Sequence, residues 1–158
     1  MQVFKPELKA KYAYCPLTGN VYRLVRCGKC LAGSVCSSKS NGGKYLKVED
    51  MLVHRLAWFL HTGEQPPSQI DHINGDGVDN RWDNLRCADY STNQMNTGVT
   101  KKSSTGVKGV YPVKRGGAFC AEIRVNGVRL QKYSKDLQYL KQWVTAKRKE
   151  LHGQYAHD

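Results

Sequence analysis

Two different periods of apolar and polar residues run along this chain. Short apolar runs, each bounded by glycine, proline or polar clusters, predict five strands in the first part of the chain. These strands are expected at residues 12–15, 21–25, 45–48, 70–73 and 85–88. Residues 33–43, rich in Ser, Gly and Lys, separate the second strand from the third and are expected to form a loop.

A helical period replaces this pattern at residues 51–62. The apolar positions that recur at helical spacing are Leu52, Leu56, Phe59 and Leu60. Gly63 suits the C-cap, and Pro66 and Pro67 prevent continuation of the helix. Two histidines, His54 and His61, lie on this helix. We expect both to flank the packed face rather than to bind a metal.

The last third of the chain has its own pattern. Alternating apolar residues predict three strands, at residues 107–113, 118–125 and 128–133. Residues 115–117 and the pair Asn126-Gly127 supply the two hairpin turns. Asp136 is then expected to cap a helix that ends near Leu151. This segment is predicted to be a small three-stranded antiparallel sheet with one helix.

A polar, basic stretch at residues 98–106 separates the two parts and is expected to be a linker. The chain is therefore divided into residues 1–97, which are rich in short strands, and residues 107–158. The fold class expected for the whole chain is α+β.

Charge changes the picture of the second part. The chain has a formal net charge of +12. Residues 1–96 carry 12 Lys and Arg against 9 Asp and Glu, whereas residues 97–158 carry 13 against 4. This excess predicts a polyanionic partner, with nucleic acid ahead of an acidic membrane surface. No apolar run approaches the ~18 residues of a membrane span, and no secretion signal is recognisable, so we expect no membrane partner.

The six cysteines give a weak signal. Cys27 and Cys30 form a CxxC pair, which could bind a structural zinc ion together with Cys15 or Cys36. A second CxxC pair at the spacing of a zinc ribbon is missing. We therefore favour free thiols in a reducing compartment over zinc or disulfides.

The densest group of polar residues lies between residues 70 and 96. Imidazole titrates near neutrality, so His72 could activate water, while Asp71 and Asn93 offer hard oxygen ligands for Mg²⁺ or Mn²⁺. Asn93 and Asn96 would share one face of a short helix, so either could be the ligand. The strands expected at residues 70–73 and 85–88 would form a ribbon, and Asn84 is expected to bridge the loop between them to this ribbon. Asp71 and His72 are neighbours on a strand, so both can act only if the ribbon twists or ends there.

These residues resemble a known motif. Asp71-His72, Asn84-Leu85-Arg86 and Asn93 are similar to the HNH motif of phage and intron-encoded endonucleases, in which an Asn replaces the final His. The resemblance covers residues 12–97 and implies a ββα-metal (His-Me finger) core. It also implies His72 as general base, one divalent metal on Asp71 and Asn93, and Asn84 as a structural residue.

The tail, residues 104–155, resembles the plant ethylene-response-type (Apetala-like) DNA-binding domain, which implies a sheet lying on DNA with a helix behind it. The Lys147-Arg148-Lys149 run departs from the small residues common there, and it could also be a solvated face. Across the chain, the cations expected to contact DNA are Arg55, Arg86, Lys101, Lys102, Lys108, Lys114, Arg115, Arg124, Arg129 and Lys132.

The sequence thus predicts a metal-dependent DNA endonuclease acting on duplex DNA. The resemblance implies a phage-borne homing or nicking enzyme in a bacterial cytoplasm, with a monomer as the default. One alternative is a non-cleaving DNA-binding regulator on the same fold, and another is an RNA-binding accessory protein. Intact Asp71, His72 and Asn93 favour the nuclease. The three acids expected to be merely solvated are Asp76, Asp79 and Asp83.

Overall fold

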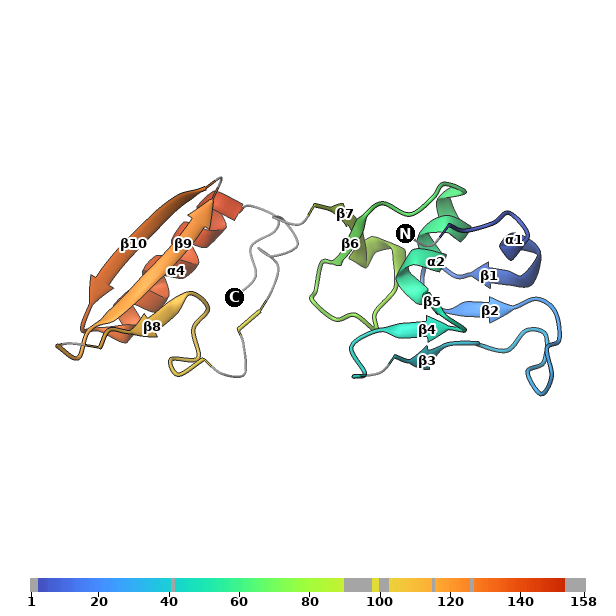
Figure 1. Cartoon of the computed structure of the whole chain (residues 1–158), viewed down its shortest axis with the longest axis horizontal. Helices are drawn as coiled ribbons and strands as arrows, with labels where there is room; N and C mark the ends of the chain where they lie inside the picture. The colour runs from blue at the N-terminus through green and yellow to red at the C-terminus, as the bar shows by residue number, and fades with distance from the viewer. Residues whose placement is uncertain are drawn as a thin grey trace. The chain divides into compact units, whose positions relative to one another are not determined.

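The computed structural model describes residues 3–40, 42–89, 98–99, 103–114, 116–125 and 127–152. Small antiparallel sheets and a few helices make up this part of the chain (Figure 1). The chain divides into two compact units, residues 1–93 and residues 94–158. Within the described ranges, no helix is both long and apolar enough to cross a membrane.

The N-terminal unit begins with short elements. They are α1 (Leu8–Lys11), β1 (Tyr12–Tyr14), β2 (Val21–Arg23), β3 (Ser38–Lys39), β4 (Leu46–Val48), β5 (Met51–Leu52) and α2 (Val53–Thr62). β1 and β2 form an antiparallel hairpin, and β3, β4 and β5 form a separate antiparallel sheet. The strands predicted at residues 12–15, 21–25 and 45–48 are confirmed. α1, β3 and β5 were not predicted.

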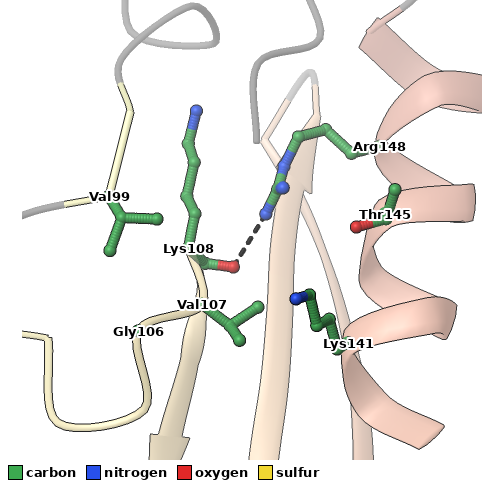
Figure 2. Close-up of a pocket in the computed structure, with 7 residues that line it drawn as sticks. All are labelled: Val99, Gly106, Val107, Lys108, Lys141, Thr145 and Arg148. Carbon is green, nitrogen blue, oxygen red and sulfur yellow. Dashed lines mark hydrogen bonds between the residues drawn. The ribbon is translucent and has the colours of Figure 1, made fainter. Parts of the chain in front are cut away.

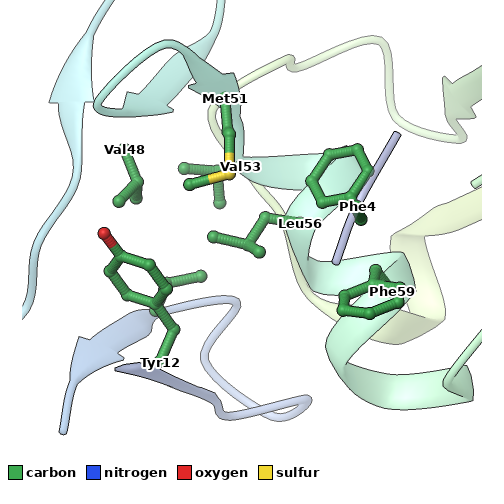
Figure 3. Close-up of a cluster of buried hydrophobic side chains, with 8 residues drawn as sticks. Phe4, Tyr12, Val48, Met51, Val53, Leu56 and Phe59 are labelled. Carbon is green, nitrogen blue, oxygen red and sulfur yellow. The ribbon is translucent and has the colours of Figure 1, made fainter. Parts of the chain in front are cut away.

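The core of this unit lies between α2 and the short strands. Figure 3 shows α2 directing Leu56 and Phe59 toward Phe4 and Tyr12, with side chains of β4 and β5 closing the cluster. Burying each of these large side chains contributes about 1.5–3 kcal/mol. α2 ends as expected, because Gly63 adopts a φ of 82° and its N–H donates to the Phe59 carbonyl at 2.9 Å.

An antiparallel ribbon follows α2. β6 (Gln69–His72) pairs with β7 (Leu85–Ala88), so that Asp71 lies opposite Arg86 and His72 opposite Leu85. The 3₁₀ helix η1 (Trp82–Asn84) leads into β7. β6 ends at His72, where the Gly75 N–H donates to the His72 carbonyl at 2.8 Å. Asp71 and His72 can both act at one site only if the ribbon twists or ends beside them, and here it ends.

A second small apolar cluster joins the ribbon to α2. Ala57 on α2 packs with Ile70 on β6 and Leu85 on β7. Beside them, the rings of Trp58 and Trp82 lie with centroids 5.1 Å apart. The helix therefore supports the ribbon from one side and fixes where its polar residues lie.

The C-terminal unit has the predicted sheet and helix. β8 (Val110–Pro112), β9 (Phe119–Val125) and β10 (Val128–Ser134) form an antiparallel sheet with β9 in the centre, and α4 (Leu137–His152) packs on it (Figure 1). Leu140 and Val144 of α4 are fully buried. Asp136 caps α4 as predicted, since its Oδ1 accepts the N–H groups of Gln138 and Tyr139 at 2.9 and 3.1 Å.

We expect Gly19→Ala to destabilise the N-terminal unit more than Gly33→Ala. Both glycines have positive φ, 73° and 82°, so alanine is strained at either site by about 1–2 kcal/mol. A Cβ at Gly19 would also lie 2.5 Å from the Asn80 carbonyl carbon, whereas nothing lies within 4 Å of one at Gly33. This overlap adds about 1–3 kcal/mol. Urea unfolding of both variants tests the difference, and equal destabilisation would contradict the close approach of Gly19 to Asn80.

Candidate active site

His72 is buried at the end of β6, with 5% of its surface exposed. Its Nε2 lies 3.3 Å from Oδ1 of Asn80. The ring of His54 meets it edge to face at a centroid distance of 5.2 Å, and the ring of Tyr45 lies 6.0 Å away. The four side chains of this group come from four places in the chain: His72 from β6, His54 from α2, Tyr45 from the segment before β4 and Asn80 from the loop after β6.

Burial lowers the pKa of His72, because the interior disfavours an imidazolium. The hydrogen bond to Asn80 and the negative charges of Asp71, Asp76 and Asp79 act in the opposite direction but do not cancel the effect of burial. The net direction is downward from 6.5. His72 is therefore a neutral imidazole at physiological pH, which is the form that can accept a proton.

His54 is not the polar flank that the sequence predicted. It is 7% exposed, and its Nδ1 has no hydrogen-bond partner among the described residues. Burial is the main cause that lowers its pKa to about 3, and electrostatic interactions with His72 and Arg55 act in the same direction. The helical pattern failed here because β4 and the ribbon both pack against α2 and cover a second face. His61 does lie on an exposed flank, and its ring is tilted against the Trp82 ring with the two centroids 4.1 Å apart.

Asp71 is also buried, at 5% exposure, and it is paired across the ribbon with Arg86. The Nε and Nη2 atoms of Arg86 lie 2.8 and 2.6 Å from Oδ2 of Asp71. Arg55, the other cation of this unit expected to contact DNA, donates to backbone carbonyls of Pro66 and Pro67. The structure thus places both arginines against the protein's own acceptors.

Asn84 joins the loop to the ribbon. Its Oδ1 accepts the Asn74 N–H at 3.0 Å, and its Nδ2 donates to the Asn74 side chain at 3.0 Å and to the Asp79 carbonyl at 2.7 Å. Asp79 is not merely solvated, because Arg81 binds both of its oxygens and lowers its pKa. Asp76 accepts the Val78 N–H, while Asp83 is exposed.

The remaining metal-site residues fall on an undescribed segment. Asn93 and Asn96, with the short helix predicted for them, lie outside the described residues. Within the described ranges, no group of three or more His, Cys, Asp or Glu side chains is arranged to hold a metal ion. Cys27 and Cys30 are exposed free thiols whose backbones exchange two hydrogen bonds of 3.0 Å.

Comparison with known proteins identifies the family of the segment that contains His72 and Asp71. Residues 51–95, from β5 through the ribbon, match the HNH endonuclease family model. Over 104 residues, 65% of this chain, the sequence is 32% identical to Protein 3.8 of Escherichia phage T7, and the match covers 86% of that protein. The chain belongs to the Protein 3.8 family. The predicted HNH resemblance is confirmed at the level of the family match. No solved structure matches the chain.

Beyond the HNH segment, the C-terminal unit has one open sheet face. Along β9, Ala121 and Ile123 turn toward α4, so alternate residues face away from the helix. The residues of this open face are Tyr111, Cys120, Glu122, Arg124, Arg129, Gln131 and Tyr133. Glu122 lies at its centre and pairs with Arg124 at 2.9 Å and Arg129 at 2.6 Å. Burial raises the pKa of Glu122, but these hydrogen bonds and that from Tyr111 outweigh burial and lower it.

The other predicted cations of this unit lie elsewhere. Lys132 extends on the helix side of β10, with Nζ 5.9 Å from the Tyr139 ring centroid. Lys108 borders a pocket of about 230 Å³ beside α4, where Arg148 reaches across and donates to the Lys108 carbonyl at 2.7 Å (Figure 2). Lys114 is exposed after β8. Lys101, Lys102 and Arg115 lie outside the described residues.

Proposed function

We propose that this protein is a metal-dependent endonuclease that hydrolyses phosphodiester bonds in duplex DNA. The observation that carries the proposal is the coincidence of the HNH family match with a buried, neutral His72 beside Asp71. The phage relative supports a role in an infected bacterium. We place the protein there as a homing or nicking enzyme of the host cytoplasm. The core that contains His72 would be of the ββα-metal type.

His72 would act as the general base. A neutral imidazole accepts a proton from water as the water attacks phosphorus, and the leaving 3′ oxygen departs on the opposite side. The lowered pKa keeps His72 unprotonated at neutral pH, so the base is ready in the resting enzyme. Asn84 would hold the loop that carries Asn80 at a fixed distance from the ribbon.

Asp71 and Asn93 would hold the metal, with Asn96 as the alternative to Asn93. The fit rests on Asp71, a buried carboxylate of the hard oxygen type that Mg²⁺ and Mn²⁺ prefer, next in sequence to the proposed base. A bound Mg²⁺ or Mn²⁺ supplies positive charge for the phosphate and the leaving oxygen. Arg86 would orient the Asp71 carboxylate through its two contacts with Oδ2.

We assign DNA holding to the C-terminal module, residues 107–158, joined to the nuclease module, residues 1–97, by the linker at 98–106. The module would bind as ethylene-response-type domains do, through the open sheet face. Arg124 and Arg129 support this, because Glu122 fixes both guanidinium groups on that face. Arginine is suited to bidentate contacts with phosphate or guanine.

The double variant Arg124→Gln with Arg129→Gln should bind duplex DNA more weakly. Each phosphate that the variant no longer neutralises makes the negative slope of log affinity against log salt shallower by about 0.9. The matched control is Lys147→Gln with Lys149→Gln, which removes the same charge from α4 and also breaks one ion pair, that of Lys147 with Glu150. Fluorescence anisotropy over a salt series measures both. An equal loss of affinity in the two double variants would contradict binding through the open face.

Incubating the purified chain with supercoiled plasmid tests the function itself. We expect nicked or linear product with Mg²⁺ or Mn²⁺ and none when a chelator is present. Binding of duplex DNA without any metal-dependent cleavage would overturn the endonuclease and favour a regulator on the same fold. Tighter binding to single-stranded RNA than to duplex DNA would favour an RNA-binding protein.

A further inference from the structure

Asn80 is the most deeply buried polar side chain around His72, with 2% of its surface exposed. Its Nδ2 donates to the Val78 carbonyl at 3.0 Å. A carbonyl oxygen can only accept, so this bond fixes which end of the Asn80 amide carries nitrogen. The other end, Oδ1, then faces Nε2 of His72 at 3.3 Å.

An amide oxygen is also only an acceptor, so Nε2 of His72 must be the donor. In a neutral imidazole only one nitrogen carries hydrogen, and the lone pair therefore lies on Nδ1. We propose that Asn80 is a positioning residue that holds His72 in the Nε2-protonated tautomer and so presents Nδ1 as the basic nitrogen. This inference rests on the proposed function of His72 as general base.

The hydrogen bond also fixes the orientation of the ring. A half-turn of the imidazole would place Cε1 where Nε2 now lies, and the bond to Asn80 would be broken. His54 and Tyr45 pack against the ring with centroids 5.2 and 6.0 Å away. These contacts limit tilting but do not distinguish one ring nitrogen from the other. Among the described contacts of His72, the distinction comes from Asn80.

Asn80 is itself held by segments distant in the sequence. The Tyr14 hydroxyl on β1 donates to the Asn80 carbonyl at 2.7 Å. Next along the loop, the Trp82 N–H donates to the Pro16 carbonyl at 3.0 Å. Gly19 leaves room for the Asn80 backbone, as its close approach shows. The hairpin of β1 and β2 therefore serves the site by fixing the residue that orients the base.

Two substitutions separate this role from a merely structural one. Asn80→Leu removes both polar contacts, whereas Asn80→Asp loses the donor to Val78 but keeps an acceptor for His72. We expect Asn80→Leu to lower kcat for plasmid cleavage on the order of 10²-fold with KM unchanged, the range that general-base catalysis supplies. Asn80→Asp should retain most of the activity. A wild-type kcat in Asn80→Leu, a change confined to KM, or equal loss of activity in both variants would overturn the proposal.

The tautomer can be observed directly in the wild-type protein. Ring ¹⁵N chemical shifts of His72, assigned by loss of the signals in His72→Ala, distinguish a protonated nitrogen from one with a lone pair. At mildly alkaline pH we expect Nε2 protonated and Nδ1 unprotonated. The opposite pattern would overturn the role of Asn80 even if the enzyme cuts DNA. The expected pattern in a protein that does not cut DNA would instead leave the tautomer intact and refute the endonuclease function.

Discussion

His72→Ala will reduce metal-dependent plasmid cleavage by about 10²–10⁴-fold, the contribution that a positioned general base makes. The affinity for duplex DNA should stay the same, because the variant keeps every cation expected to hold DNA. The physical reason is the position of His72, buried at the end of β6 beside Asp71 and neutral at physiological pH. Single-turnover cleavage and a separate binding assay without metal measure the two effects.

His61→Ala is the matched control for this experiment. His61 belongs to the same unit, but it is exposed on α2 and stacks on Trp82 rather than on His72. It should cut DNA at nearly the wild-type rate. Undiminished cleavage by His72→Ala would move the base to another residue, and equal loss of cleavage in both variants would point to a loss of stability instead of a loss of the base.

Local patterns were sufficient to predict the elements with clear periodicity. β7 occupies the predicted residues 85–88, and α2 ends at Thr62 with the predicted Gly63 as its C-cap. The two-residue strands β3 and β5 escaped prediction because two residues carry no alternation. They are strands only because β4 lies between them and pairs with both. Their existence depends on tertiary contacts that no local window contains.

The motif residues were predictable because their spacing resembles a known family, but their surroundings were not. Nothing near Asn80 in the sequence marks it as the partner of His72, since the loop also contains Asn74 and Asn84. Arg86 was predicted to contact DNA, and its pairing with Asp71 depends on the register of β6 and β7. The burial of His54 depends likewise on which elements pack against α2. Contacts between residues distant in the sequence determine the partner of His72, the pairing of Arg86 and the burial of His54.

Acid should destabilise the N-terminal unit from about pH 6.5 downward, and His54→Phe should remove most of that sensitivity. The pKa of His54 is about 3 in the folded protein against an ordinary value of 6.5. Between these values the unfolded chain binds a proton that the folded chain does not, so the stability present above pH 6.5 is lost as the pH falls. The slope approaches about 1.4 kcal/mol for each pH unit.

Phenylalanine keeps a ring against Tyr45 and His72 but has nothing to protonate. A Trp143→Phe background leaves Trp58 and Trp82 as fluorescence reporters of the N-terminal unit, and urea unfolding then gives its stability at each pH. The informative window lies between 6.5 and 4.5, above the range in which Glu49 and Asp79, whose pKa values are lowered, lose their own contributions. Parallel curves for His54→Phe and the background would show that the buried ring of His54 does not cause the acid sensitivity, leaving His72, whose pKa is also lowered, as its source.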